Sequence, residues 1–389
     1  MGSPSFPPEL WSHSFQFLGT LDEVTDSSPS AWANIVSSNP KYTYRPSDSA
    51  IECNGTKRAL GLVCRTFYKL SRPVVFERIS LWSEDSLRFL SRRIAENPEM
   101  ARIAGRYTKR IDFNFELEDH TSDYEQPFIK DLEFILESCG NLTFLLLPKW
   151  SRWRPGVDSN KNALLEVVRL HEMFDLRLGH NLCTFTNLRV LDFSTVKVPY
   201  FWESPPGRLP LVHTIIGAVE VVCSHFEDTE LPSLSTLIIS EEPRIFTDFT
   251  SFLQKHKEEI KSLDIRFFRF FEFTGTLAIP NLRELVVDLI NQGVTRSPWE
   301  HLQSLGITEN FGSEGDAAFR DLLHRLETIE SQREIGNCPN LRVVRVLDDN
   351  LARLLREGNR RTVRLRERRL RALSIKLEDS RGNSITYAT

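Results

Sequence analysis

The sequence predicts an α/β solenoid preceded by a small helical module. Three observations lead to this prediction. A short Leu-x-x-Leu-x-aliphatic pattern recurs along most of the chain, helical stretches separate several of its copies, and two amphipathic segments flank a polar stretch near the N-terminus. With 389 residues, the chain has room for a small module and a long repeat array.

Composition excludes several classes of protein. Apolar residues make up 40% of the chain and charged residues 26%, and the net charge of −4 argues against nonspecific nucleic-acid binding as the main task. The six cysteines lack the close regular spacing of a disulfide framework or zinc ribbon, which suits a reducing compartment. We find no signal peptide and no apolar run of the ~18–20 residues that span a bilayer. We therefore expect a cytoplasmic or nuclear protein that does not enter a membrane.

The first amphipathic segment is FPPELWSHSFQFL, residues 6–18. Pro7 and Pro8 can lead into a helix, because its first N–H groups lack intrahelical partners anyway, and Glu9 in the first turn suits the helix dipole. An apolar stripe at helical spacing then follows, made of Leu10, Trp11, Phe15 and Leu18.

The second segment, residues 60–79, has the same character. Its stripe at three- and four-residue spacing consists of Leu60, Val63, Phe67, Leu70 and Val74. Pro73 should end or bend this helix, since it lacks an N–H group and crowds the preceding turn. Residues 25–57, rich in Ser, Pro, Asn and Thr, are expected to form an inserted loop.

Together the two segments resemble an F-box of fungal type. Three sequence motifs carry the resemblance: Phe6-Pro7-Pro8-Glu9-Leu10, then Leu62-Val63-Cys64-Arg65 with Phe67, then Leu70-Ser71-Arg72-Pro73 with Phe76. The resemblance covers residues 1–80 and implies docking onto the Skp adaptor of ubiquitin ligases and, through it, onto a cullin. The residues that it assigns to adaptor binding are Phe6, Pro7, Pro8, Leu10, Trp11, Phe15, Leu18, Leu62, Val63, Cys64, Phe67, Leu70 and Pro73.

Two departures from the family pattern leave alternatives open. Phe6 stands where the family has leucine, and the insertion separates halves that are normally contiguous. A surface loop is compatible with docking, because closure entropy grows slowly with loop length. The insertion could also block the adaptor, or reflect an error in the gene model.

The rest of the chain, residues 81–389, carries the repeats. Full copies of the pattern begin at residues 142, 188, 234, 282, 302 and 370, near matches at 260 and 341, and a weaker copy at 108. The residue directly before the first leucine is Asn141, Asn187, Asn281 or Asn340 in four copies and Ser233 in another. Alternation at the end of each copy predicts a short half-buried strand.

Helical stretches precede several of these strands, at residues 128–139, 252–260 and 317–329. The helix–turn–strand unit resembles a degenerate leucine-rich repeat with insertions, spaced 20 to 46 residues apart where regular repeats run ~20–29. The alternative is an α/β domain whose parallel strands are unrelated in sequence.

If the repeats form a solenoid, alternate strand residues should face outward along the inner sheet. We expect some of them to contact a target protein. The residues singled out are Asp192, Ser194, Thr236, Ile238, Asp264, Arg266, Glu284, Val286, Asp288 and Arg345. The alternative for any one of them is an ordinary solvated sheet face.

Other signals are set aside. The segment 353–371 is dense in arginine and could bind an acidic partner or nucleic acid, but a solvated cap is favoured because the end of a solenoid needs a polar outer face. Val363 and Leu365 suggest a short strand in it. The run at 266–273 holds five phenylalanines and is expected to pack rather than to stack on bases. No catalytic, phosphate-binding or paired metal-ligand motif is present, so we expect a non-enzyme without metal or cofactor.

Two functions remain. In the first, the protein is the substrate-recognition subunit of a Skp–Cullin–F-box ubiquitin ligase, with the array holding an unknown target. In the second, it is a leucine-rich-repeat interaction scaffold without a ubiquitin role, and its N-terminal helices cap the array. The second function requires those helices to pack onto the first repeats.

Overall fold

The computed structural model describes most of the chain after residue 63 and falls into two compact units. Of the described residues, the first unit holds those from 59 to 192 with 207–209, and the second holds 193–195 and those from 210 to 385. The described residues are 59, 62, 64–115, 125–147, 164–171, 182, 185–195, 207–226, 229–239, 247–265, 279–288, 299–308, 316–357, 360–380 and 382–385. The predicted first helix, the inserted loop and the phenylalanine run at 266–273 lie outside them.

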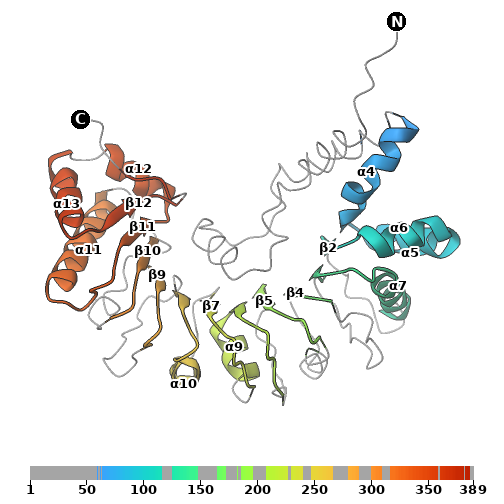
Figure 1. Cartoon of the computed structure of the whole chain (residues 1–389), viewed down its shortest axis with the longest axis horizontal. Helices are drawn as coiled ribbons and strands as arrows, with labels where there is room; N and C mark the ends of the chain where they lie inside the picture. Colours follow the sequence, from blue (N-terminus) through green and yellow to red (C-terminus); the bar gives the residue numbers. More distant parts are fainter. Residues whose placement is uncertain are drawn as a thin grey trace, which may run out of the picture. The chain divides into compact units, whose positions relative to one another are not determined.

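The first unit alternates helices with short parallel strands (Figure 1). Its elements are α4 (Arg65–Glu77), β1 (Arg78–Leu81), α5 (Glu84–Glu96), α6 (Pro98–Tyr107), β2 (Arg110–Phe113), α7 (Glu125–Ser138), β3 (Phe144–Leu146), β4 (Val167–His171) and the start of β5 (Val190–Thr195). Strands β1 to β4 pair in parallel, each with the next in the sequence.

The second unit repeats this arrangement. After the end of β5 it contains β6 (Thr214–Gly217), α9 (Val219–Phe226), β7 (Thr236–Ile239), α10 (Thr247–His256), β8 (Ser262–Ile265), β9 (Glu284–Asp288), β10 (Ser304–Thr308), α11 (Asp316–Glu334), β11 (Val343–Val346), α12 (Asp349–Glu357), α13 (Arg360–Ala372) and β12 (Lys376–Glu378). Within each unit, the strands follow one another in the sheet in the order of the chain. Each unit therefore has the repeated parallel α/β arrangement that the sequence predicts.

One turn introduces many of the strands. The N–H group of the first residue of a copy donates to the carbonyl three residues earlier, and both residues are buried. These pairs are Leu142 with Cys139, Leu188 with Phe185, Leu234 with Leu231, Leu282 with Ile279, Leu302 with Trp299 and Leu341 with Cys338. The turn brings the chain back beside the preceding copy, where the next strand begins.

The asparagines noted in the sequence bind one copy to the one before it. Asn141 Nδ2 donates to the carbonyl of Arg106 at 3.0 Å, and Asn281 Nδ2 donates to that of Glu258 at 2.7 Å. Asn340 Nδ2 reaches the carbonyl of Glu300 at 2.6 Å. Ser233 makes the equivalent bond through its hydroxyl, to the carbonyl of Pro210 at 2.6 Å. A side-chain donor at this place thus links neighbouring copies.

Three copies escaped the sequence pattern, at residues 76–81, 165–170 and 212–217, where they form β1, β4 and β6. Their sequences, FERISL, LEVVRL and VHTIIG, keep apolar residues at the first, fourth and most sixth places but lack the paired leucines. The copy assigned to 370–375 is also misplaced. Leu370 lies in the last turn of α13, Ser374 has φ 61°, and the strand follows at β12.

The predicted helices before residues 142, 260 and 341 are observed as α7, α10 and α11. The strand suggested around Val363 is wrong, because that residue lies in α13. Its buried side chain belongs to a helical rather than an alternating pattern. Long arginine side chains favour helix, which explains the outcome.

Candidate interaction surfaces

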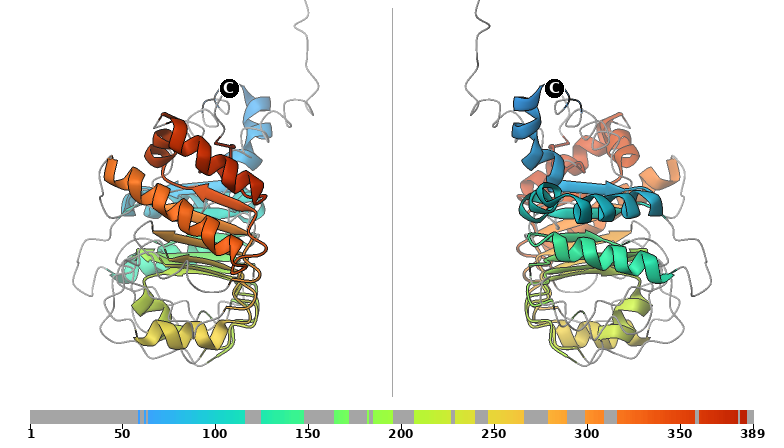
Figure 2. Two further views of the ribbon diagram at one scale, coloured as in Figure 1. Left: turned by 90° about the vertical axis from the view of Figure 1, so that its left-hand side faces the viewer. Right: turned by 90° about the vertical axis from the view of Figure 1, so that its right-hand side faces the viewer.

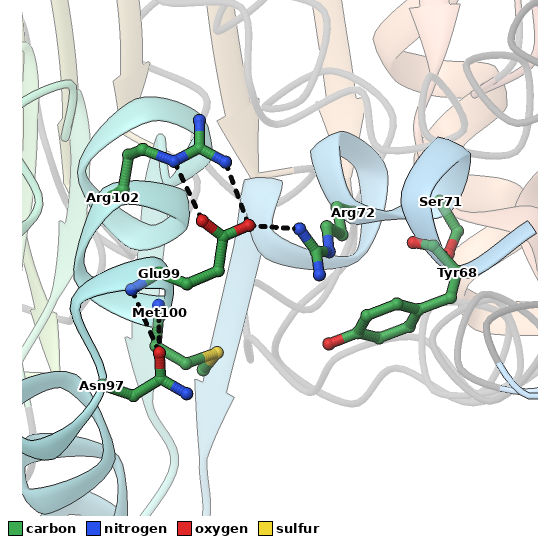
Figure 3. Close-up of polar contacts among 7 residues, drawn as sticks. All are labelled: Tyr68, Ser71, Arg72, Asn97, Glu99, Met100 and Arg102. Carbon is green, nitrogen blue, oxygen red and sulfur yellow. Dashed lines mark hydrogen bonds and ion pairs between the residues drawn. The ribbon is translucent and has the colours of Figure 1, made fainter. Parts of the chain in front are cut away.

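Helix α4, the second half of the F-box resemblance, packs against α6 and runs directly into β1 (Figure 3; Figure 2, right). Arg72 of α4 donates to Glu99 Oε1 of α6 at 2.5 Å, and Arg102 holds both oxygens of the same carboxylate at 3.0 and 3.1 Å. The Arg72 guanidinium also lies 4.6 Å from the centre of the Tyr68 ring. Two guanidinium groups thus share one carboxylate where the two helices meet.

The start of α6 fixes the position of that carboxylate. Asn97 caps the helix by accepting hydrogen bonds from the N–H groups of Glu99 and Met100, and Pro98 occupies the first helical position. Glu99 lies in the first turn, where negative charge suits the helix dipole. Hydrogen bonds from Arg102, then from Arg72, lower the pKa of Glu99 below its ordinary 4.5.

The second predicted helix begins later than expected, and of the two alternatives for Pro73 the structure excludes an end of the helix at that residue. Cys64 is extended, with φ −163°, and its Sγ accepts a hydrogen bond from the N–H of Phe67, so α4 begins at Arg65 rather than within a helix from residue 60. Pro73 does not end the helix, which continues to Glu77. Proline removes only one hydrogen bond, to the carbonyl of Lys69. Lys69 is exposed, so water can satisfy that carbonyl.

Most residues assigned to adaptor binding lie outside the described part of the chain, namely Phe6, Pro7, Pro8, Leu10, Trp11, Phe15, Leu18 and Val63. Among the rest, Leu62 is 87% exposed and Cys64 is exposed. Phe67, Leu70 and Pro73 are half-buried, while Ser71 and Val74 are buried. Leu62 and Cys64, just before α4, therefore present more side-chain surface than the middle of the helix. Adaptor binding stays a prediction, as does the domain division at residue 80, which falls within β1.

The strands of each unit have two faces. One carries the aliphatic and aromatic core, such as Phe193 of β5, whose ring centre lies 5.8 Å from that of Phe226 in α9. The side chains between these core residues point to the opposite face. In the first unit, that opposite face holds Arg78, Arg110 and Asp112, and the side chains of all three are at most 9% exposed.

Ion pairs explain this burial. Arg78 Nε and Arg110 Nε donate to the two oxygens of Asp112 at 2.6 and 2.7 Å. The Arg110 guanidinium also lies 4.1 Å from the centre of the Phe144 ring. Further along the same unit, Arg169 of β4 donates through Nε to Asp192 of β5, and both are buried. Buried charges require such partners.

The expectation that the target-contacting residues are exposed is therefore mostly wrong. Buried side chains are found at Asp192, Thr236, Ile238, Asp264, Val286 and Asp288. Asp288 lies near the buried guanidinium of Arg325 in α11, whose pKa is lowered to about 10 by burial while Asp288 raises it. Glu284 is exposed and Arg345 half-buried. Arg266 and the side chain of Ser194 lie outside the described residues.

An accessible row remains in the second unit. Five residues stand side by side in register on β8 to β12, and we call them the open row: Ser262, Glu284, Ser304, Val343 and Lys376. Glu284 and Lys376 are exposed, and the other three are half-buried. Neighbouring strands lie ~4.8 Å apart, so the open row is about 19 Å long.

A second row lies beside the open row on the same face, two residues further along each strand. Arg345 and Glu378 form an ion pair of 3.0 Å, and Gly306 sits between Val286 and Arg345 in register. A Cβ at Gly306 would lie 2.9 Å from Val286 Cγ2 and 3.0 Å from Leu347 Cδ1, so these two side chains fill the space. The sequence pattern missed Lys376 because it placed the last strand too early.

Other chemistry has little support within the described residues. They contain no group of three or more His, Cys, Asp or Glu side chains placed to hold a metal ion. None of their helices combines the length and apolar character needed to cross a bilayer. The open row brings together one carboxylate, one ammonium group, two hydroxyls and one apolar side chain, which suits recognition of a mixed polar surface.

Comparison with known proteins adds one structural likeness. No family model matches the chain, and a comparison with curated proteins finds no match. Among solved structures, a leucine-rich-repeat protein of Leptospira interrogans is 11% identical, with 82% of this chain and 93% of that chain covered and a TM-score of 0.32. The repeat assignment here rests on the hydrogen bonds and strand register of this chain.

Proposed function

We propose that this chain is a protein-interaction scaffold of leucine-rich-repeat type that performs no catalysis. The open row carries the proposal. Its five side chains come from five successive strands, so the repeat builds one continuous surface from residues more than 110 positions apart in sequence. A target protein would lie along this row, contacting Glu284 and Lys376 at exposed positions and Val343 between them.

The packing of α4 supports the scaffold over a detached docking module. Its contacts with α6 and its direct passage into β1 suit a helix that covers the first repeat. A solenoid end requires such a cover, because the terminal repeat otherwise leaves its apolar side in water.

The test is affinity capture from source cells with the intact chain and with the charge-swapped variant Glu284→Lys/Lys376→Glu. We expect a specific set of proteins to bind the intact chain and to be lost with the variant. A matched control is Arg92→Glu/Glu96→Lys, which swaps two exposed charges of α5 and likewise leaves the net charge unchanged. Proteins that stay bound to the swapped variant as strongly as to the control would contradict recognition through the open row.

A second, finer function is that of a substrate receptor for a Skp–Cullin ubiquitin ligase. The observation that favours it is the exposure of Leu62, at 87%, because this leucine is the first residue of the Leu-Val-Cys-Arg segment that carries the F-box resemblance. Such an apolar side chain in water is available to a partner. In this function the scaffold would place its bound target near the ligase and raise the effective concentration of the two.

The two functions separate in a co-purification with the Skp adaptor. We expect a substrate receptor to retain the adaptor and Leu62→Glu to release it. Phe89→Glu, at a 65% exposed apolar residue of α5, is the matched control. If the intact, folded chain binds no adaptor, the ligase function is excluded and only the scaffold function remains.

A further inference from the structure

Helix α13 carries a strip of positive charge that neither the core nor the open row uses. Its exposed arginines at three- and four-residue spacing form what we call the arginine stripe: Arg361, Arg364, Arg368 and Arg371. Residues at this spacing lie on one side of a helix. Leu365, which is 50% exposed, lies within the same stretch.

The inward side of α13 accounts for a different set of residues. Val363 and Leu370 are buried, and Arg366 is held by Glu327 at 2.9 Å and Glu330 at 3.0 Å, both on α11. Figure 2 (left) shows α13 alongside α11, and the two helices are in contact. These contacts dock the helix without Arg364 or Arg368.

The two central arginines of the stripe, Arg364 and Arg368, are poorly neutralised. Arg371 pairs with Glu367 of its own helix at 2.5 Å, but Arg364 and Arg368 have no acidic partner among the described residues. Like charges four residues apart disfavour a helix by roughly 0.2–0.5 kcal/mol. The first turn also lacks any acidic residue and begins with arginine, which the helix dipole disfavours. Arginine itself favours helix, so the cost here lies in the crowding of like charges on one side of α13, which capping alone does not require.

We propose that the arginine stripe binds an acidic segment of a partner protein. The stripe runs from residue 361 to 371, which spans about 15 Å along a helix. An extended peptide covers that distance with about five residues. Glutamate or aspartate side chains of such a segment would pair with Arg364 and Arg368, and an apolar side chain between them would cover Leu365.

An acidic peptide fits the stripe better than a nucleic acid or a membrane does. The chain has a net charge of −4, and the exposed carboxylates of Glu327 and Glu357 lie on elements that contact α13 or adjoin it, so the positive surface stays narrow. Nucleic-acid backbones are bound by broader basic faces. A helix in a lipid interface inserts an apolar face, whereas Val363 and Leu370 are turned inward here.

The test uses the full chain and a fluorescein-labelled peptide of ten glutamates with one central leucine, titrated by anisotropy at about 50 and 150 mM NaCl. We expect saturable binding that weakens with salt. Arg364→Glu/Arg368→Glu should weaken it by about tenfold or more and Leu365→Ser by about threefold. The control Arg92→Glu/Lys130→Glu, with the same change in net charge, should stay within about twofold.

Several outcomes would overturn the proposal. One is no binding, and another is equal loss in the stripe and control variants. A third is tighter binding of another ligand than of the peptide, with that binding lost in the stripe variant. The ligands to be compared are a single-stranded oligonucleotide and anionic vesicles of phosphatidylserine and phosphatidylcholine. If Arg364→Glu/Arg368→Glu fails to fold by circular dichroism, Arg364→Gln/Arg368→Gln removes the charges without reversing them and must weaken peptide binding in the same direction.

Discussion

The same positions of the repeat hold buried ion pairs in the first unit and an accessible row at the end of the second. On β2 these positions are Arg110 and Asp112, which are at most 1% exposed. On β9 and β12 the first of them is Glu284 or Lys376, and both side chains are exposed. Position in the repeat sets the direction of a side chain, whereas its ion-pair partners and neighbours on that face set its exposure. A charged residue at these positions is therefore structural in one region and available for binding in the other.

The largest difference should appear when a carboxylate is removed from each region. Asp112→Ala leaves Arg78 and Arg110 buried without their shared partner, and breaking a buried pair in this way lowers the free energy of unfolding by about 3–5 kcal/mol. Glu284→Ala removes an exposed side chain and should change it by less than about 0.5 kcal/mol. Urea unfolding of both variants, followed by circular dichroism, measures the two values.

Equal effects of these two substitutions would abolish the contrast between the regions. A further control is Asp112→Asn, which keeps the shape of the side chain and some hydrogen bonds but not the charge. We expect its free energy of unfolding to lie between that of Asp112→Ala and that of the unmodified chain. A stability of Asp112→Asn at or above that of the unmodified chain would mean that the two arginines need no counter-charge.

The next largest effect on stability is expected from the packing around Gly306, in the row beside the open row. Gly306→Ala places a methyl group 2.9 Å from Val286 Cγ2 and 3.0 Å from Leu347 Cδ1, so neighbouring side chains must shift. Overpacking of this kind lowers the free energy of unfolding by about 1–3 kcal/mol. Thermal unfolding measures it, and Gly306→Ala/Val286→Ala should recover part of the loss. A Gly306→Ala variant as stable as the unmodified chain would show that the space is open.

The strand-forming repeats were largely predictable from sequence, because each copy needs apolar residues at fixed places. Leu142, Leu188, Leu234 and Leu282 all begin copies that form strands at the expected places. The missed copies show the limit of a leucine-based pattern. Val212 begins β6's copy with the same buried role, since burial requires an apolar side chain and not leucine in particular.

The candidate sites were less predictable. Alternation gives the face on which Asp192 lies, but only the partner Arg169, on another strand, explains why it is buried. Lys376 was missed for a related reason. Helix α13 extends to Ala372, so the last strand begins at Lys376, beyond the start of the sequence pattern at residue 370. Contacts across strands depend on loop lengths between copies, which vary here and leave no periodic signal.

The bonds between copies should contribute less than the buried pairs. Asn281→Ala removes the hydrogen bond to the carbonyl of Glu258, and one such bond contributes about 1 kcal/mol to the free energy of unfolding. His301 occupies the same place in its own copy and makes no such bond within the described residues, so His301→Ala is the matched control. Denaturant unfolding should separate the two variants. Indistinguishable midpoints would mean that water replaces the asparagine without loss.

The smallest effect is expected where α4 meets α6, and it should depend on pH. Arg102 and Arg72 lower the pKa of Glu99 in the folded chain, so the ionised carboxylate stabilises the folded state above its unfolded pKa near 4.5. That contribution is lost as the pH falls through the lower, folded pKa. Glu99→Gln should therefore unfold slightly more readily than the unmodified chain at pH 7, and the difference should shrink toward pH 3. Glu96→Gln, at an exposed carboxylate of α5, is the control and should show no such trend. A Glu99→Gln difference that stays constant from pH 7 to pH 3 would mean that the carboxylate acts there through its shape and not its charge.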